Sequence, residues 1–277
     1  MRMRFTVVSY ALGLMMHVCA IAGITIVPPC ENDFKEKDFP FVGQLININN
    51  GVSGSAVAIG NGKFIITSKH CVTHDGKTYG MLLDGSNFVY IQNDQYVMLN
   101  KIWSNEGCDM AIGLLTTPVR QSVKLANYKI KSKQDFYGVG YGMGCSKINS
   151  NKLEFDLPYG TKRVYKNTIQ GCFENEQLHV FKKIETEAIF YFILREKGSR
   201  HGEPILGEGM PGPGDSGGGL FVYNNGEFEL FAIVHAIKTE SPMYAYATDC
   251  FAQKTWIQTI VLDAFSCEKQ SINDFHL

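Results

Sequence analysis

Short apolar runs of strand length recur through most of the 277-residue chain, and they constrain its fold more than any other feature. Gly, Asn, Asp and Pro separate the runs, and these residues favour turns over helices. Such punctuation is typical of an all-β protein. The expected strands are 41–48, 54–59, 63–67, 88–91, 110–115, 136–141, 177–182, 188–194, 220–223 and 228–234.

Other local patterns predict how the strands are connected. Gly60-Asn61-Gly62 and Asn224-Asn225-Gly226 each lie between two expected strands and predict hairpin turns, because Asn and Gly accept positive φ angles. Apolar residues at helical spacing over 251–265 predict one terminal helix, with Thr248 or Asp249 as candidate cap. The polar stretch 127–134 is the expected crossing between two halves.

Size and charge narrow the function classes. The length suits one large domain or two barrel-sized halves with filled cores. Charged residues make up 19% of the chain and the net charge is -1, so no general attraction to nucleic acid or anionic lipid follows. We therefore predict no nucleic-acid partner.

The first residues have the pattern of a secretory signal peptide. Arg2 and Arg4 precede an uncharged apolar run over 5–18, and Ala20 and Ala22 follow it. This order predicts cleavage after Ala22, export to the periplasm or the cell exterior, and no stable membrane association afterwards. The alternative is an uncleaved anchor, because the uncharged stretch from Phe5 is long enough to span a bilayer.

Seven of the eight cysteines follow the predicted signal, namely Cys30, Cys71, Cys108, Cys145, Cys172, Cys250 and Cys267. Export permits disulfides, and an odd number leaves at least one thiol free or joined to another molecule. The connectivity stays open. The sequence contains no C-x-x-C pair and no zinc-like Cys/His spacing, so we predict neither a metal site nor a cofactor.

The densest Gly/Pro segment carries a single serine. Residues 211–219 read Pro-Gly-Pro-Gly-Asp-Ser-Gly-Gly-Gly, which predicts a tight, backbone-exposed loop. Backbone N–H groups bared by the glycines can bind an oxyanion that develops beside Ser216. Ser216 is therefore a candidate nucleophile, and the alternative is a surface turn that happens to contain a serine.

A serine nucleophile needs a general base, and the base needs an acid that orients it. His70 follows the expected strand 63–67, and Asp109 directly precedes the expected strand 110–115, so both lie at strand ends. They are the candidate base and its partner. Other histidines lack such an acid-bearing strand in the right order, and these are His74, His179, His201 and His235.

Three motifs together resemble those of the trypsin-like, or chymotrypsin-fold, serine proteases. They are Thr67-Ser68-Lys69-His70-Cys71-Val72, Asp109-Met110-Ala111-Ile112-Gly113-Leu114-Leu115 and Gly214-Asp215-Ser216-Gly217-Gly218, in the order His, Asp, Ser that this fold requires. The resemblance covers about residues 38–262 and implies two six-stranded antiparallel β-barrels that meet at a cleft. We expect a signal over 1–22, a first barrel with His and Asp over 23–125, a second barrel with Ser over 126–250, and a helix and tail over 251–277.

The resemblance also assigns roles. Ser216 would attack the scissile carbonyl, His70 would take its proton and pass it to the leaving amine, and Asp109 would orient His70. The N–H groups of Gly214 and Ser216 would form the oxyanion hole. These roles predict a serine endopeptidase that acts on protein or peptide substrates through an acyl-enzyme. The alternative is a catalytically silent module that keeps the barrels and binds a partner.

The cysteines depart from the family pattern. The family joins the cysteine after its histidine to one on the preceding strand, but here we expect Val52 or Ser53 opposite Cys71. Cys71 is therefore free or paired elsewhere, and Cys108 is one candidate. Gly212 stands where the family often has a further cysteine.

Activation and specificity follow from the resemblance as well. Asp215 suggests a pair with an N-terminal ammonium, although Ile26 lacks the usual glycines and a basic cleavage site before it. The positions expected to bind substrate are Met210, His235, Ile237 and Met243. Three large apolar side chains in the pocket, with no acid at its floor, predict cleavage after small or medium apolar residues. His235 lies on the strand expected to pair with the substrate backbone.

Overall fold

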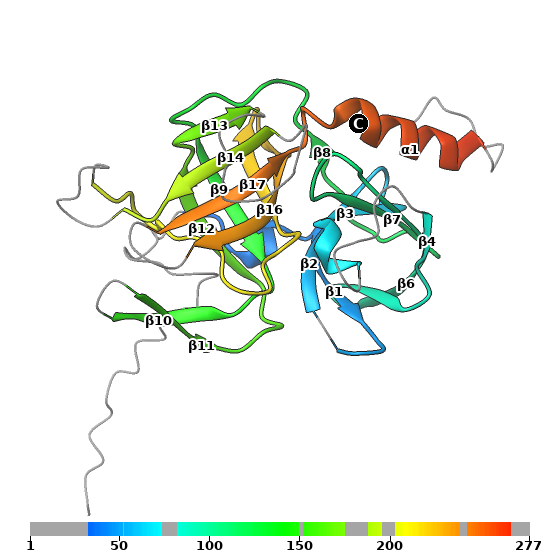
Figure 1. The fold of residues 1–277 in the computed structure, drawn as a ribbon, viewed down its shortest axis with the longest axis horizontal. Helices are drawn as coiled ribbons and strands as arrows, with labels where there is room; N and C mark the ends of the chain where they lie inside the picture. The colour runs from blue at the N-terminus through cyan, green and yellow to red at the C-terminus, as the bar shows by residue number, and fades with distance from the viewer. Residues whose placement is uncertain are drawn as a thin grey trace, which may run out of the picture.

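Two β-sheets lie side by side in the computed structural model, with a separate hairpin and a C-terminal helix (Figure 1). The structure describes residues 33–51, 53–73, 82–149, 152–174, 188–195, 203–238 and 243–266. The predicted all-β class with one terminal helix is confirmed. The predicted signal peptide and the expected strand 177–182 lie outside the described residues.

The first sheet closes into an antiparallel barrel. Its strands are β1 (Val42–Asn47), β2 (Ser53–Ile59), β3 (Phe64–Thr67), β4 (Leu82–Asp84), β5 (Phe88–Gln92), β6 (Gln95–Ser104) and β7 (Ala111–Leu115). The order β6-β5-β1-β2-β3-β7 returns on itself because β6 also pairs with β7, while β4 extends β6 outside the ring. Gly60, Asn61 and Gly62 all have positive φ angles, which confirms the hairpin turn predicted there.

The second sheet is a half-barrel. Its strands are β8 (Lys124–Leu125), β9 (Asp135–Gly140), β12 (Arg163–Thr168), β13 (Gly171–Glu174), β14 (Ala188–Ile193), β15 (Gly219–Asn224), β16 (Glu227–Lys238) and β17 (Tyr244–Asp249). The order is β12-β9-β15-β16-β17-β14-β13, with β8 parallel to β16. Asn225 and Gly226 have positive φ angles in the predicted turn before β16.

A side chain, rather than a backbone ladder, connects strands β12 and β14 of the second sheet. Among the described residues no ladder joins β12 to β14. The buried Asn167 of β12 instead donates from Nδ2 to the carbonyls of Ile193, at 3.2 Å, and Gly209, at 2.7 Å. The second barrel is therefore less closed than the two six-stranded barrels of our expectation.

Every expected strand within the described residues is present, but further strands were not predicted. β6 and β17 alternate buried with partly exposed residues, whereas the prediction relied on continuous apolar runs. β10 (Gly144–Asn149) and β11 (Lys152–Leu157) form the separate hairpin. β8 already pairs with the second sheet, so the chain crosses between the sheets before the expected stretch 127–134.

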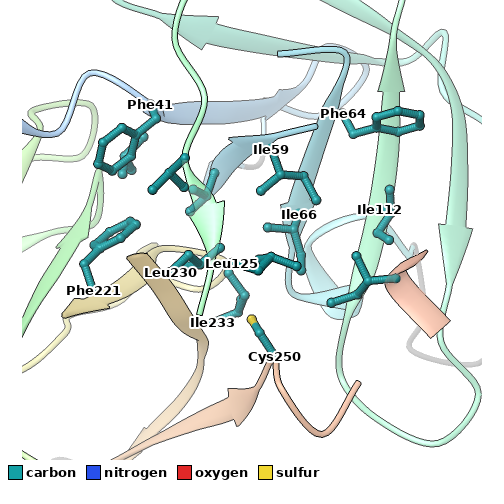
Figure 2. Close-up of a cluster of buried hydrophobic side chains, with 14 of the residues drawn as sticks. Phe41, Ile59, Phe64, Ile66, Ile112, Leu125, Phe221, Leu230, Ile233 and Cys250 are labelled. Carbon is teal, nitrogen blue, oxygen red and sulfur yellow. The ribbon is translucent and has the colours of Figure 1, made fainter. Parts of the chain in front are cut away.

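One hydrophobic cluster joins the two sheets. Figure 2 shows Phe41, Ile59 and Ile66 of the first half beside Phe221 and Leu230 of the second. All five side chains are buried. Because each sheet covers apolar side chains of the other, burial in this cluster fixes how the two halves sit together.

The C-terminal helix α1 (Lys254–Ser266) packs on the same cluster. Ile257 and Val261 are buried in it, as the helical spacing predicted. Asp249 Oδ1 accepts the N–H of Phe251 at 2.8 Å in the turn before the helix, so it orders the approach to α1 rather than its first residue. Of the helices in the described residues, none has the length and apolarity needed to cross a membrane.

Candidate active site

The pairing of β3 with β7 brings His70 and Asp109 together. His70 lies in η2 (Lys69–Cys71), the short 3-10 turn after β3, and Asp109 precedes β7. His70 Nδ1 lies 2.6 Å from Asp109 Oδ2, and the backbone N–H of His70 donates to Asp109 Oδ1 at 2.9 Å. The carboxylate therefore fixes both the ring and the backbone of His70, and the roles of base and orienting acid stay a prediction.

Burial and hydrogen bonding act in opposite directions on this pair. Burial lowers the pKa of His70, but the hydrogen bond to Asp109 and the neighbouring Cys71 outweigh it and raise that pKa above its ordinary value. Burial raises the pKa of Asp109, but the bonds and charge of His70, with the charge of His235, lower it overall. Asp109 is therefore a carboxylate that stabilises the protonated form of His70.

The loop with Ser216 is fixed against the His70 segment. The carbonyl of Ser216 accepts the N–H of Ser55 in β2 at 2.8 Å. Cys71 Sγ, in the residue after His70, lies 3.5 Å from the same carbonyl oxygen. The backbone N–H of Gly217 donates to Val234 of β16 at 2.9 Å. Contacts to both sheets thus hold the serine loop at their boundary.

The glycines of this loop adopt conformations that other residues rarely take. Gly214 has φ +89° and Gly217 has φ +83°. A Cβ on Gly217 would lie 2.1 Å from the carbonyl oxygen of Ser55, so only glycine fits there. Within the described part of the chain, neither the N–H of Gly214 nor that of Ser216 donates a hydrogen bond.

The carboxylate of Asp215 is buried behind the loop. It accepts the N–H of Gly142 at 2.7 Å and that of Gly212 at 2.8 Å. A Cβ on Gly140 would lie 2.2 Å from Asp215 Oδ1, so the backbone approaches the carboxylate closely. Burial raises the pKa of Asp215 to about 6, although these bonds and the charge of Arg163 oppose the rise. The ammonium partner predicted for Asp215 belongs to residues outside the described ranges.

Comparison with known proteins agrees with this arrangement. A family model described as Trypsin matches residues 30–257, most of the chain. The chain belongs to the trypsin family. A solved structure titled "Crystal structure of Rv3671c protease, inactive form" aligns with a TM-score of 0.53 and 14% identity, over 81% of this chain and 90% of that one, which shows a shared fold. No match was found among curated proteins.

In this trypsin-family site, the prediction of which residue lies opposite Cys71 is wrong. Gly54 of β2, rather than Val52 or Ser53, stands opposite Cys71, since a Cβ on Gly54 would lie 2.9 Å from Cys71 Sγ. The prediction missed this because strand register cannot be counted through a turn of unknown length. Cys71 and Cys250 carry free thiols in the described part of the chain.

Arg163 also supports the site, although the sequence analysis predicted no role for it. Arg163 is buried and donates to the carbonyls of Gly142 and Pro158, the latter at 3.0 Å. It therefore anchors the segment that binds Asp215. Gly140 and Gly142, at the end of the expected strand 136–141, are the sequence signal that would have indicated a close backbone approach.

The four expected substrate-binding residues separate into two groups. Met210 and Met243 are fully buried in one cluster of the second sheet, and Ile237 packs against that cluster. His235 lies elsewhere, with Nε2 3.7 Å from Asp109 Oδ2. A role in substrate binding stays a prediction for all four.

Proposed function

We propose that this member of the trypsin family is a serine endopeptidase that hydrolyses peptide bonds through an acyl-enzyme. One observation carries the proposal: the 2.6 Å contact between His70 Nδ1 and Asp109 Oδ2, at the boundary where the loop of Ser216 meets the first sheet. Family membership supports the same reaction class.

The chemistry follows from the arrangement of these groups. Asp109 binds Nδ1–H of His70, which leaves Nε2 as the basic nitrogen that takes the hydroxyl proton of Ser216 during attack. The tetrahedral oxyanion is bound by the N–H groups of Gly214 and Ser216. His70 then protonates the leaving amine, and a water molecule activated by the same base releases the acyl group from Ser216.

The substrate preference is part of the proposal. Met210 has no charge to bind Lys or Arg, and its cluster includes Met243 with Ile237 packed against it. Apolar walls of this size favour small or medium apolar side chains before the scissile bond. A peptide library cleaved only after Lys or Arg would refute this preference.

Export is also proposed, on the signal-like pattern of residues 1–22 alone. The mature N-terminus, determined by mass spectrometry on protein recovered from the medium or periplasm, should follow Ala22. An intact N-terminus on membrane-bound protein would favour the anchor instead.

Replacement of the nucleophile tests the hydrolase directly. Ser216→Ala should lower kcat/KM on a peptide substrate by roughly 10⁴-fold or more, because the acyl-enzyme cannot form. Thermal unfolding should change little, since the Ser216 side chain is only partly buried. Ser86→Ala in an exposed turn is the matched control and should retain full activity. Equal turnover by Ser216→Ala and the wild type would refute the proposal.

A further inference from the structure

A β-bulge in β16 places His235 at the active site. In the pairing of β16 with β17, Val234 lies opposite Ala247 and Ala236 opposite Tyr246, so His235 is the extra residue between two consecutive partners. Bulges re-aim side chains and recur beside active sites. From the sequence alone we expected His235 on a regular strand that pairs with the substrate. The sequence gives no sign of the bulge, so this shift in the position of His235 was not predicted.

The bulge is held by the serine loop and the His70 segment. The N–H of Val234 donates to the carbonyl of Gly218 at 2.8 Å, and its own carbonyl accepts the N–H of Gly217 at 2.9 Å. Ser68 Oγ donates to the same carbonyl at 2.6 Å. The residue before His235 is thus fixed by both segments that carry Ser216 and His70, which leaves His235 little freedom to move.

The imidazole of His235 shares one carboxylate oxygen with His70. His235 Nε2 lies 3.7 Å from Asp109 Oδ2, the oxygen that His70 Nδ1 contacts at 2.6 Å. The ring centroids of the two histidines are 6.4 Å apart. The His235 side chain is 10% exposed, so solvent screens its effect on Asp109 only weakly. At this separation the interaction is electrostatic rather than a normal hydrogen bond.

We infer that His235 is a positioning residue that acts through Asp109, by limiting the negative charge that this carboxylate presents to His70. A second imidazole 3.7 Å from Oδ2 competes with His70 for the negative charge of the same carboxylate. Its presence therefore keeps the pKa of His70 lower than Asp109 alone would set it, and leaves more of the neutral base. The inference rests on the proposed hydrolase function.

Other ionisable groups lie on the elements packed around this site, and the test must separate them from His235. Cys71 follows His70 and interacts with its side chain. Lys69 donates from Nζ to the carbonyl of Asn105 at 2.9 Å. β17 contributes Tyr246, opposite Ala236, and Asp249, opposite Ala232. Substitution of His235 leaves all of these groups in place.

An NMR titration of the His70 ring tests the inference without relying on turnover. In His235→Phe, which keeps a ring but removes its nitrogens, the pKa of His70 should rise by about 0.5 to 1 unit. His235→Gln, which keeps an N–H donor at this position, should give a smaller rise in the pKa of His70. Glu229→Gln on the same strand, bonded to Tyr128, is the control and should leave the His70 curve unchanged.

Kinetics on the same proteins separate positioning from substrate binding. The acid limb of kcat/KM should move to higher pH in His235→Phe by the same amount as the His70 titration, with little change in KM. An unchanged His70 titration in both variants, or a raised KM alone, would overturn the inference and return His235 to substrate binding. Absence of hydrolysis by the wild type would refute the proposed function, whereas the NMR curves would still decide the role of His235. Were His235→Phe not to fold, the His70 titration in His235→Gln would decide it.

Discussion

Asp215 shows at the scale of one residue how the nucleophile loop holds its shape. Two backbone N–H groups bind the carboxylate, and glycines at 140 and 142 give it room. The bond from Gly212 closes the turn over residues 212–215, and the bond from Gly142 ties this turn to the segment after β9; Ser216 is the next residue in the chain. This arrangement buries an ionisable group, the carboxyl of Asp215.

That burial predicts a pH-dependent cost in stability. The pKa of Asp215 is raised from 3.8 to about 6, so the folded chain holds this proton more tightly than the unfolded chain does. The contribution to stability is fully present below about pH 4 and is lost as pH rises through about 6, by roughly 2–3 kcal/mol. In Asp215→Asn the loss is absent, so the destabilisation caused by this substitution should be larger at pH 4 than at pH 7 by that amount.

Urea unfolding of both proteins across this pH range measures the difference. Asp94→Asn, at an exposed position, is the matched control for the loss of one carboxylate. A difference between wild type and Asp215→Asn that is constant with pH would contradict the raised pKa.

The sequence predicts the role of a residue when its neighbours in the chain form a recognisable motif. It does not predict a role that depends on a contact with a distant segment. His70, Asp109 and Ser216 each lie in a recognisable motif. Gly54 lies beside Cys71 because of the register of β2, and His235 lies beside Asp109 at a bulge in β16. Neither can be read from composition or spacing.

At the scale of elements, the register of β2 against η2 makes a sharp prediction. A Cβ on Gly54 would lie 3.4 Å from Cys71 Cβ and 2.9 Å from its Sγ, close to the separations found in disulfides. Gly54→Cys should therefore form a disulfide with Cys71. The closed loop should raise the unfolding free energy by about 3 kcal/mol under oxidising conditions.

Mass spectrometry of a non-reduced digest identifies the bridge, and a reducing agent should remove its stabilising effect. The double variant Gly54→Cys with Cys71→Ser is the matched control, because it has the same new side chain without the partner thiol. Free thiols at both positions after oxidation would show that β2 is out of the register described here.

Strand prediction succeeded for continuous apolar runs and failed where polar residues interrupt the apolar ones, as in β6 and β12. β3 is buried throughout and was expected, whereas β6 alternates buried and exposed residues and was not. The helix α1 was expected because its apolar residues repeat at helical spacing. The opening of the second sheet was not predictable, since it depends on which groups the side chain of Asn167 bonds.

At the scale of the whole molecule, the shared cluster makes the two sheets and α1 a single cooperative unit. Ile257→Ala removes a fully buried side chain from this cluster and should cost about 2–5 kcal/mol. Calorimetry should show one unfolding transition in the wild type and one, at lower temperature, in the variant. Leu262→Ala on the exposed face of α1 is the control and should change the transition little.

Two separate transitions, of which Ile257→Ala shifts only one, would show that the halves fold independently. A single shifted transition has a consequence for the site, because His70 and Asp109 come from the first sheet while Ser216 comes from a loop of the second. Their relative placement then depends on the same buried contacts.

Covalent labelling of Ser216 by a fluorophosphonate probe tests the convergence of these groups most directly. The probe reacts only with a serine whose hydroxyl is activated by a base beside an oxyanion site. The folded wild type, with its N-terminus determined on the same sample, should carry one probe per chain at Ser216, and labelling should be lost in His70→Ala. No adduct at Ser216, or equal labelling of His70→Ala, would contradict a catalytic triad in this protein.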